Sequence, residues 1–331
     1  MPVMGTEEAQ QRVWTWIDEG DDTAVLDLSR LGLIVLPSLP STLHSLNCSR
    51  NLLATLPSQL PVALHTLACE HNQLAALPDL LPARLQRLHC GNNRLAALPA
   101  RLPDDLETLN CEHNSLSTLP ARLPAALHTM YCDHNQLAEL PIKLPATLYI
   151  LHCGNNQFVR LPTPLPATLR TLHCDNNLLH ALPAQLPALL QTLYCQYNQL
   201  TALPVRLPPT LEYLNCRNNQ LASLPFKLPK TLVLLYCSHN QLAALPAHLP
   251  LALEYLTCDG NTWYFTVPIQ TVKRLSMSPA AYCSVHYQRF AHRLFNKWRE
   301  RKQRRVLVAC LEKELVVLPT VLVWLVARYS L

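Results

Sequence analysis

Glycine is scarce in this sequence, and its scarcity excludes several kinds of site. Only 6 of the 331 residues are glycine, which leaves little room for the glycine-rich loops that cradle phosphates. Neither GxGxxG nor GxxxxGK[ST] occurs. No two cysteines have the CxxC spacing of many zinc sites. The N-terminus is acidic and polar, so it lacks the basic and then apolar pattern of a cleavable signal peptide.

Proline and cysteine are abundant instead, with 28 and 13 residues. Because proline interrupts long helices and central strands, such a content requires a fold that places it at regular, tolerated positions. The cysteines reveal the period, since eleven of them are each 21 residues apart: Cys48, Cys69, Cys90, Cys111, Cys132, Cys153, Cys174, Cys195, Cys216, Cys237 and Cys258. An asparagine follows three residues after every one, from Asn51 to Asn261.

The repeated unit has the consensus LxxLxCxxNxLxxLPxxLPxx. Its second leucine and its cysteine alternate on a short strand, so they share one face. One strand cannot bury that face, but stacked copies pair edge to edge and form a continuous core. The asparagine turns the chain and can bond backbone groups of adjacent turns, and the two prolines predict an extended outer return path without helix.

These units resemble leucine-rich repeats, and the LPxxLP segment is similar to that of the IpaH-type bacterial effector ubiquitin ligases. The resemblance covers roughly residues 25–261. It implies an α/β-type solenoid: a horseshoe with a parallel β-sheet on the concave face, an extended polyproline convex side, a helical N-terminal cap and a helical C-terminal segment. The IpaH-type ligases add a long helical domain with a cysteine nucleophile beside an aspartate. Here only about 70 residues follow the repeats, so we expect no enzyme activity.

The two ends of the repeat region predict capping structures. Residues 24–42 form a degenerate unit, one residue shorter, with Leu28 at the cysteine position and Leu31 at the asparagine position. Before it, residues 7–19 carry Val13, Trp14 and Ile17 at helical spacing, which predicts a helix that caps the solenoid.

Charge divides the chain into three parts that match these boundaries. Residues 1–42 hold two basic and seven acidic side chains, residues 43–261 hold thirteen and twelve, and residues 262–331 hold twelve and three. The net charge of +5 is therefore a property of the last part. We expect an N-terminal cap over 1–24, repeats over 25–262 and a basic, mainly helical segment over 263–331.

The cysteines have three chemical interpretations, namely disulfides, a metal site and a nucleophile. A row of thiols about 4.8 Å apart does not converge on one metal ion, and eleven cannot all pair. The neighbouring histidines point outward where the cysteines point inward. We therefore expect small buried hydrophobes in a reducing compartment, without cofactor or metal. Cys283 and Cys310 lie outside the row, in no recognisable motif.

The solvent positions of the strands line the concave face, and they predict a binding surface. Aromatic side chains on or beside this face are Tyr131, Tyr149, His152, His173, Tyr194, Tyr197, Tyr213, Tyr236 and Tyr255. Acidic side chains share the column after the cysteine, at Glu70, Glu112, Asp133, Asp175 and Asp259, against one basic residue, Arg217. Basic side chains share an outer column, at Arg101, Arg122, Lys143, Arg206 and Lys227. Because tyrosine is a favoured interface anchor, we expect a protein partner with basic character and no small-molecule substrate.

The C-terminal part leaves several interpretations open. Its basic cluster is Arg289, Arg293, Lys297, Arg299, Arg301, Lys302, Arg304 and Arg305. A basic cluster of this kind has four possible roles: binding of nucleic acid, nuclear import, contact with anionic lipid, or the solvated face of a capping helix. The apolar stretch 315–331 is too short for a membrane span and contains Pro319. It loosely resembles the docking helices of ubiquitin ligase adaptors.

Two functions follow from the sequence. The first is a non-catalytic interaction module, an effector or scaffold that binds its partner on the concave face. The second is a ligase adaptor whose repeats select a substrate while residues 315–331 recruit the machinery. Free thiols and the polar N-terminus predict an intracellular location, in the cytoplasm, or in a host cell's cytoplasm or nucleus for an injected effector.

Overall fold

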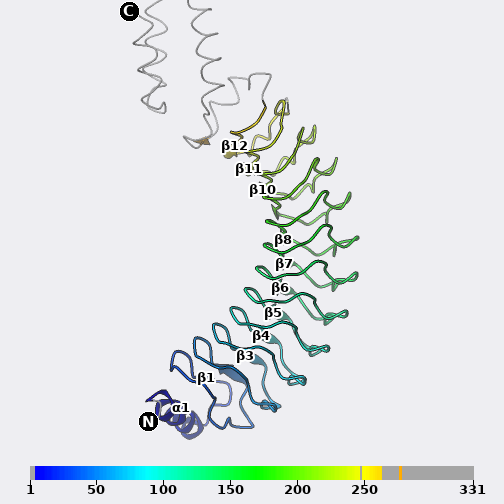
Figure 1. The fold of residues 1–331 in the computed structure, drawn as a ribbon. Helices are drawn as coiled ribbons and strands as arrows, with labels where there is room; N and C mark the ends of the chain where they lie inside the picture. Colours follow the sequence, from blue (N-terminus) through cyan, green and yellow to red (C-terminus); the bar gives the residue numbers. More distant parts are fainter. Residues whose placement is uncertain (1–3, 247, 263–275, 278–331) are drawn as a thin grey trace, which may run out of the picture.

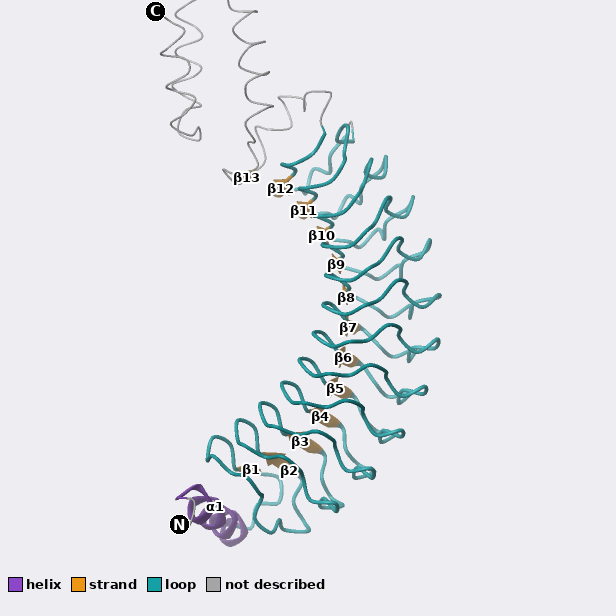
Figure 2. Ribbon diagram, viewed as in Figure 1, coloured by secondary structure: helices purple, strands orange, loops and turns teal. Residues whose placement is uncertain are grey.

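A computed structural model describes residues 4–246, 248–262 and 276–277, and these form a curved solenoid (Figure 1). Within this part the chain has one helix, α1 (Met4–Glu19). The strands follow in chain order: β1 Val25–Asp27, β2 Ser45–Asn47, β3 Thr66–Ala68, β4 Arg87–His89, β5 Thr108–Asn110, β6 Thr129–Tyr131, β7 Ile150–His152, β8 Thr171–His173, β9 Thr192–Tyr194, β10 Tyr213–Asn215, β11 Leu234–Tyr236, β12 Tyr255–Thr257 and β13 Ser276–Met277. Figure 2 shows them on the inner side of the arc. The predicted solenoid with a parallel concave sheet is confirmed.

Each strand pairs in parallel with the next one along the chain, so the order of the sheet is the order of the sequence. Leu46 lies beside Leu67, which lies beside Leu88, a shift of one repeat per strand. The backbone pairing continues one residue past the end of β2, where the Cys48 amide donates to the Ala68 carbonyl at 2.8 Å. Three residues of strand per turn are therefore enough to fix the register of the whole stack.

The core is a set of leucine rows with the cysteine row among them. In the first full unit Leu43, Leu46, Cys48 and Leu53 are all fully buried. All eleven cysteines of the row are buried and free, as predicted. Stacking supplies this burial, since each inward side chain is covered by its counterparts in the units on either side.

The asparagines form a second row that holds adjacent turns together. Asn72 donates through Nδ2 to the carbonyls of Cys48 (3.0 Å) and Cys69 (3.1 Å), in two successive units. Its Oδ1 accepts from the Leu53 amide at 3.0 Å. The side chain thus replaces hydrogen bonds that the turning backbone cannot make itself, which explains why the position does not vary over eleven units.

The residue before each asparagine has a left-handed backbone. Its φ runs from 49° at Asn176 to 57° at Arg50 in the full units, and Gly260 has 65°. Asn and His are enriched in this region among residues with a side chain. This explains why His71, His113 and other histidines share the position, and it requires no chemical role for them.

Helix α1 covers the N-terminal end of the core, as predicted, but with a different face. The prediction placed Val13, Trp14 and Ile17 inward, whereas Trp14 and Ile17 are 55% and 51% exposed. The buried face is Ala9, Val13 and Trp16. Two reasons favour it: the small Ala9 permits a close approach, and the Trp16 indole N–H finds an acceptor in the Ala24 carbonyl at 3.1 Å.

The sheet extends one strand beyond the last sequence copy of the repeat. Strand β13 pairs with β12 with Ser276 beside Tyr255, again 21 residues apart. Residues 263–275 and 278–331 lie outside the described part of the chain. They include the basic cluster 289–305, the segment 315–331, Cys283 and Cys310, so those predictions stay predictions. None of the described helices is long and apolar enough to cross a membrane.

Candidate functional site

The concave face is built from the first and third residues of each strand and from the residue after each cysteine. In a unit such as Tyr131-Cys132-Asp133 the thiol points into the core, and both neighbours point outward because side chains alternate along a strand. Tyr131 and Asp133 are accordingly partly exposed. Each flanking position makes a row that runs across the strands, one before and one after the cysteines.

An aromatic row crosses the middle of the sheet, from β6 to β9. It consists of Tyr131, His152, His173 and Tyr194. The two histidine rings stack with centroids 3.8 Å apart and planes 12° apart. A tyrosine packs edge-on against each histidine. The ring centroids of Tyr131 and His152 are 4.8 Å apart, and those of His173 and Tyr194 are 4.4 Å apart. Four predicted site residues thus form one continuous surface.

Burial keeps the stacked histidines neutral. Desolvation lowers the pKa of His173 to about 4. The pKa of His152 is also lowered to about 4, by desolvation and by the adjacent His173, although Asp175 and Glu112 act in the opposite direction. An imidazole that is uncharged near neutral pH presents a flat, weakly polar surface to a partner.

The other predicted tyrosines are divided between smaller contacts. Tyr236 and Tyr255 meet with centroids 5.3 Å apart near the C-terminal end of the described sheet. Tyr197 is exposed and carries the Arg217 guanidinium over its ring at 5.4 Å. The ring centroids of Tyr149 and His128 are 5.8 Å apart. Tyr213 lies partly buried on β10, and no ring contact links it to the aromatic row.

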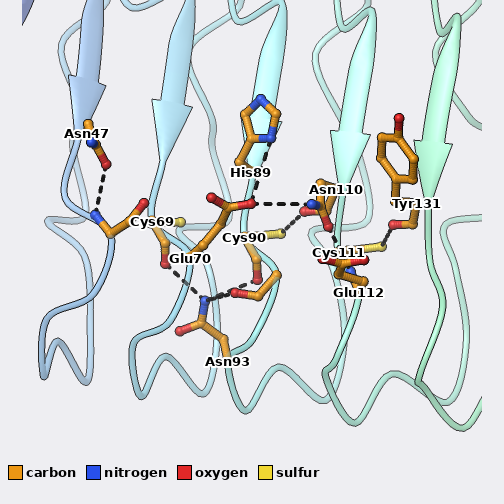
Figure 3. A network of polar contacts seen from close by, with 12 residues as sticks. Asn47, Cys69, Glu70, His89, Cys90, Asn93, Asn110, Cys111, Glu112 and Tyr131 are labelled. Carbon is orange, nitrogen blue, oxygen red and sulfur yellow. Dashed lines mark hydrogen bonds and ion pairs between the residues drawn. The ribbon is translucent and has the colours of Figure 1, made fainter. Parts of the chain in front are cut away.

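An acidic row occupies the position after the cysteine in six consecutive units, and the last three of these units also carry the aromatic row. It reads Glu70, Gly91, Glu112, Asp133, Gly154 and Asp175. Figure 3 shows its first part, where Glu70 turns toward the next two units. Its Oε1 accepts from Asn110 Nδ2 at 3.3 Å and lies 3.9 Å from His89 Nδ1. The fifth predicted acid, Asp259, is further along, where Ser238 donates to it and His239 Nε2 lies 3.5 Å away.

Two carboxylates converge at Gly154. A Cβ on this glycine would lie 3.1 Å from Asp133 Oδ1 and 2.9 Å from Asp175 Oδ1. The Gly154 amide donates to Asp133 Oδ1 at 2.7 Å. Burial raises the pKa of Asp133 to about 7, with smaller contributions from the charges of Asp175 and Glu112. Sequence reasoning identified the acids but missed their convergence, although the glycines between them were a signal for it.

The cysteines between the two rows are poor nucleophiles. Burial raises the pKa of the Cys90 thiol to about 12, and that of Cys153 well above its ordinary value, with nearby thiols and carboxylates adding to the shift. Several thiols donate to the next unit, as Cys153 Sγ does to the His173 carbonyl at 3.1 Å. Within the described ranges, no three His, Cys, Asp or Glu side chains are placed to hold a metal ion.

The outer side of the solenoid carries basic side chains, all exposed: Arg101, Arg122, Lys143, Arg206 and Lys227. The basic column on the outer side and the acidic column on the inner side therefore lie on opposite surfaces of the solenoid.

No protein-family model and no curated protein matches the sequence. Solved structures do. YopM from Yersinia pestis, described as a leucine-rich effector protein, is 34% identical with a TM-score of 0.66, over 84% of this chain and 88% of that one. YopM from Yersinia enterocolitica WA-314 is also 34% identical with a TM-score of 0.65, over 80% of this chain and 65% of that one.

The functional domain of InlJ from Listeria monocytogenes, described as including a cysteine ladder, is 25% identical with a TM-score of 0.70. The match covers 76% of this chain and 56% of that one. The chain thus spans 65% of the Yersinia enterocolitica protein and about half of the InlJ domain. The 21-residue units, the parallel sheet and the identity to YopM together show that the chain belongs to the leucine-rich repeat proteins.

Proposed function

We propose that this protein is a non-catalytic recognition module that binds a protein partner with basic character on its concave face, as an effector or scaffold. The aromatic row carries the proposal. It presents four rings in contact, held by the strands of one sheet and flanked by the partly buried acids Asp133 and Asp175. Preformed aromatic surfaces of this kind anchor partners because little side-chain entropy is lost on binding.

The cysteine row supports binding over catalysis and a reducing compartment over an oxidising one. Burial raises the pKa of the thiols, so they are protonated and shielded at neutral pH. Eleven free thiols in register are compatible with a compartment that keeps them reduced. The likeness to YopM supports an effector of the leucine-rich type, and we keep the IpaH-type resemblance of the repeats as part of the same proposal.

Substitution of the concave tyrosines tests the proposal. Partners are first identified by proximity labelling with the full chain in cells. Tyr131→Ala with Tyr194→Ala, and separately Tyr236→Ala with Tyr255→Ala, are then compared for affinity. Loss of a hot spot of 2 kcal/mol or more corresponds to about 30-fold weaker binding. The matched control is Arg122→Ala with Arg206→Ala on the outer column. If both tyrosine pairs bind every partner as tightly as the control, the concave face is not the binding surface.

The basic C-terminal part carries the alternative function, an adaptor or a nucleic-acid or anionic-lipid contact. The observation that favours it is the twelve basic residues among 262–331. A full-length variant with its basic cluster changed to glutamine separates the alternatives. Partners that persist in this variant and disappear in the tyrosine variants belong to the repeats. Co-purification of ligase subunits that depends on residues 315–331 would assign the adaptor role.

A further inference from the structure

The acidic row contains the same sequence pattern of acid, glycine and acid twice. Glu70, Gly91 and Glu112 occupy three consecutive units, and Asp133, Gly154 and Asp175 occupy the next three. In each triplet a glycine lies between two acids that come from the units before and after it. We refer to the two arrangements as the first and second acid pairs.

The acids of the second pair lean toward their glycine. Asp133 Oδ1 and Asp175 Oδ1 both lie about 3 Å from the point that a Cβ of Gly154 would occupy. The absence of a side chain at Gly154 is what permits two carboxylates from units two repeats apart to approach one place. Burial raises the pKa of Asp133, and the charge of Asp175 makes a smaller contribution in the same direction.

The first pair is arranged in a related way. Glu70 crosses the unit of Gly91 and accepts a hydrogen bond from Asn110 in the unit beyond. From the other side, Glu112 Cγ would lie 3.1 Å from a Cβ on Gly91. The dashed contacts in Figure 3 trace this bridge from Glu70 over the neighbouring strand to Asn110.

Neither pair is neutralised by the protein in the described part of the chain. There, no arginine or lysine forms an ion pair with Glu70, Glu112, Asp133 or Asp175. Within the described residues, the only ionic contact of these four acids is the weak one at 3.9 Å between His89 and Glu70. Arg217, the basic residue of the column after the cysteine, lies two units beyond the acidic row and contacts Tyr197. Glu70, Glu112 and Asp175 lie on this face without a lysine or arginine partner in the described residues, and Asp133, with its pKa of about 7, is partly ionised beside them. This set of acids favours a cationic ligand, whose charge would also favour the ionised form of Asp133.

The spacing of the pairs sets the form of that ligand. Gly91 and Gly154 are three strands apart, which is about 14 Å at the ordinary strand separation. An extended peptide advances about 13 Å over four residues, and residues i and i+4 point to the same side. The aromatic row begins beside the second acid pair, with Tyr131, His152 and His173 each two residues before a member of that triplet. Aromatic rings there can bind aliphatic stems and cationic groups.

We propose that the concave face binds an extended segment of a protein partner in which two Lys or Arg residues are four positions apart, one over each acid pair. The segment runs along the solenoid, across the strands, and from the second acid pair onward it packs against Tyr131, His152, His173 and Tyr194. The inference rests on the proposed function, because it names the chemistry that the same face recognises.

Random twelve-residue peptides displayed on phage test the proposal, with the full-length chain as the immobilised target. We expect selected sequences to carry Lys or Arg at positions i and i+4. Synthetic peptides with two lysines spaced by two, four or six residues in one Gly-Ser-Ala background then quantify the preference by fluorescence anisotropy. Spacing four should bind at least tenfold more tightly than the other two, and more weakly as salt increases.

Isosteric variants locate the contact. Asp133→Asn with Asp175→Asn, and Glu70→Gln with Glu112→Gln, should each weaken the spacing-four peptide at least tenfold. Asp79→Asn with Asp104→Asn, at exposed positions of the return path, is the matched control and should leave binding unchanged. Thermal unfolding verifies that each variant is folded. As a rescue, Asp133→Lys with Asp175→Lys should prefer a peptide in which one lysine is replaced by glutamate.

The outcomes separate this inference from the proposed function. Ligands that need Tyr131 and Tyr194 but show no basic pair at spacing four would overturn the inference and leave the concave face as the binding surface. If ligands bind equally well to the variants of the acidic row and of the aromatic row, both the inference and the proposed function are wrong. A full-length variant with its basic cluster 289–305 changed to glutamine provides one more arm. If only this variant binds the peptides, the chain's own segment is the occupant and the partner assignment is wrong.

Discussion

The stacked histidines on β7 and β8 couple the concave face to pH. Desolvation lowers the pKa of both His152 and His173 to about 4, whereas an unfolded histidine titrates near 6.5. The unfolded chain therefore binds more protons between these values. Folding stability contributed by the neutral pair is present above about pH 6.5 and is lost as the pH falls toward 4.

Replacement of both histidines by asparagine should reduce this loss. Asparagine fits, because Asn110 and Asn215 occupy the same position in other units. Between pH 7 and 4.5 we expect the wild type to lose about 1–2 kcal/mol more unfolding free energy than the double variant, a value discounted for the partial exposure of the rings. Urea denaturation at both pH values measures it. The raised pKa of Asp133 increases stability as the pH falls. Because both proteins contain Asp133, this contribution cancels in the difference between them. Equal losses in the two proteins would refute the assignment.

The asparagine row makes a prediction that depends on buried hydrogen bonds. Asn156 donates to the carbonyls of Cys132, Cys153 and Gly154 and accepts from the Leu137 amide. Asn156→Ala leaves these groups buried without partners, so we expect a loss of about 3 kcal/mol. The neighbouring Gln157→Ala, on an exposed side chain, should cost less than about 0.5 kcal/mol. Chemical denaturation compares the two. Similar values would show that the row is not a stabilising element.

Among the elements, helix α1 offers a test with a built-in control. Trp16 is buried and bonded to Ala24, whereas Trp14, two residues earlier, is 55% exposed. Trp16→Ala should destabilise the N-terminal end by about 3–4 kcal/mol through the cavity and the lost hydrogen bond. Trp14→Ala should change stability by less than about 0.5 kcal/mol. Hydrogen exchange of β1 and β2 measures local opening. Greater exposure of these strands in Trp14→Ala would restore the face that the sequence predicted.

The repeated elements could be predicted in register, whereas outside the repeats the sequence predicted helix α1 but not its buried face, and it did not predict strand β13. The alternation around each cysteine places all strands from β2 to β12, because a shift of one residue would turn every leucine outward. The face of α1 was wrong because 16 residues allow two apolar stripes, and the choice depends on an acceptor, the Ala24 carbonyl, that only the fold supplies. Strand β13 was missed because its unit lacks the asparagine and cysteine.

For the whole molecule, the rows of the concave face follow from the sequence, but the contacts within them do not. Tyr131 and His152 share a column because they are one repeat apart in the sequence. That Glu70 reaches Asn110, or that two carboxylates meet over Gly154, depends on rotamers and on the curvature of the stack. The separation between the acid pairs, in contrast, is a property of the solenoid alone, since it equals the number of units between them times the strand spacing.

Insertion of one repeat unit should therefore change the lysine spacing that the concave face prefers, while the protein stays folded. A copy of residues 190–210, placed between Ala126 and Leu127, adds a glutamine to the acidic row and separates the pairs by four strands, about 19 Å. The preferred lysine spacing should change from four to six residues, which span about 20 Å when extended. The same copy between Thr231 and Leu232 lies outside both pairs, so it should keep spacing four. Because each unit contributes its own stability and that of its interfaces, neither insertion should lower the unfolding midpoint. Anisotropy with the three lysine peptides measures the preference, and an unchanged preference for spacing four after the first insertion would show that the two acid pairs do not act together.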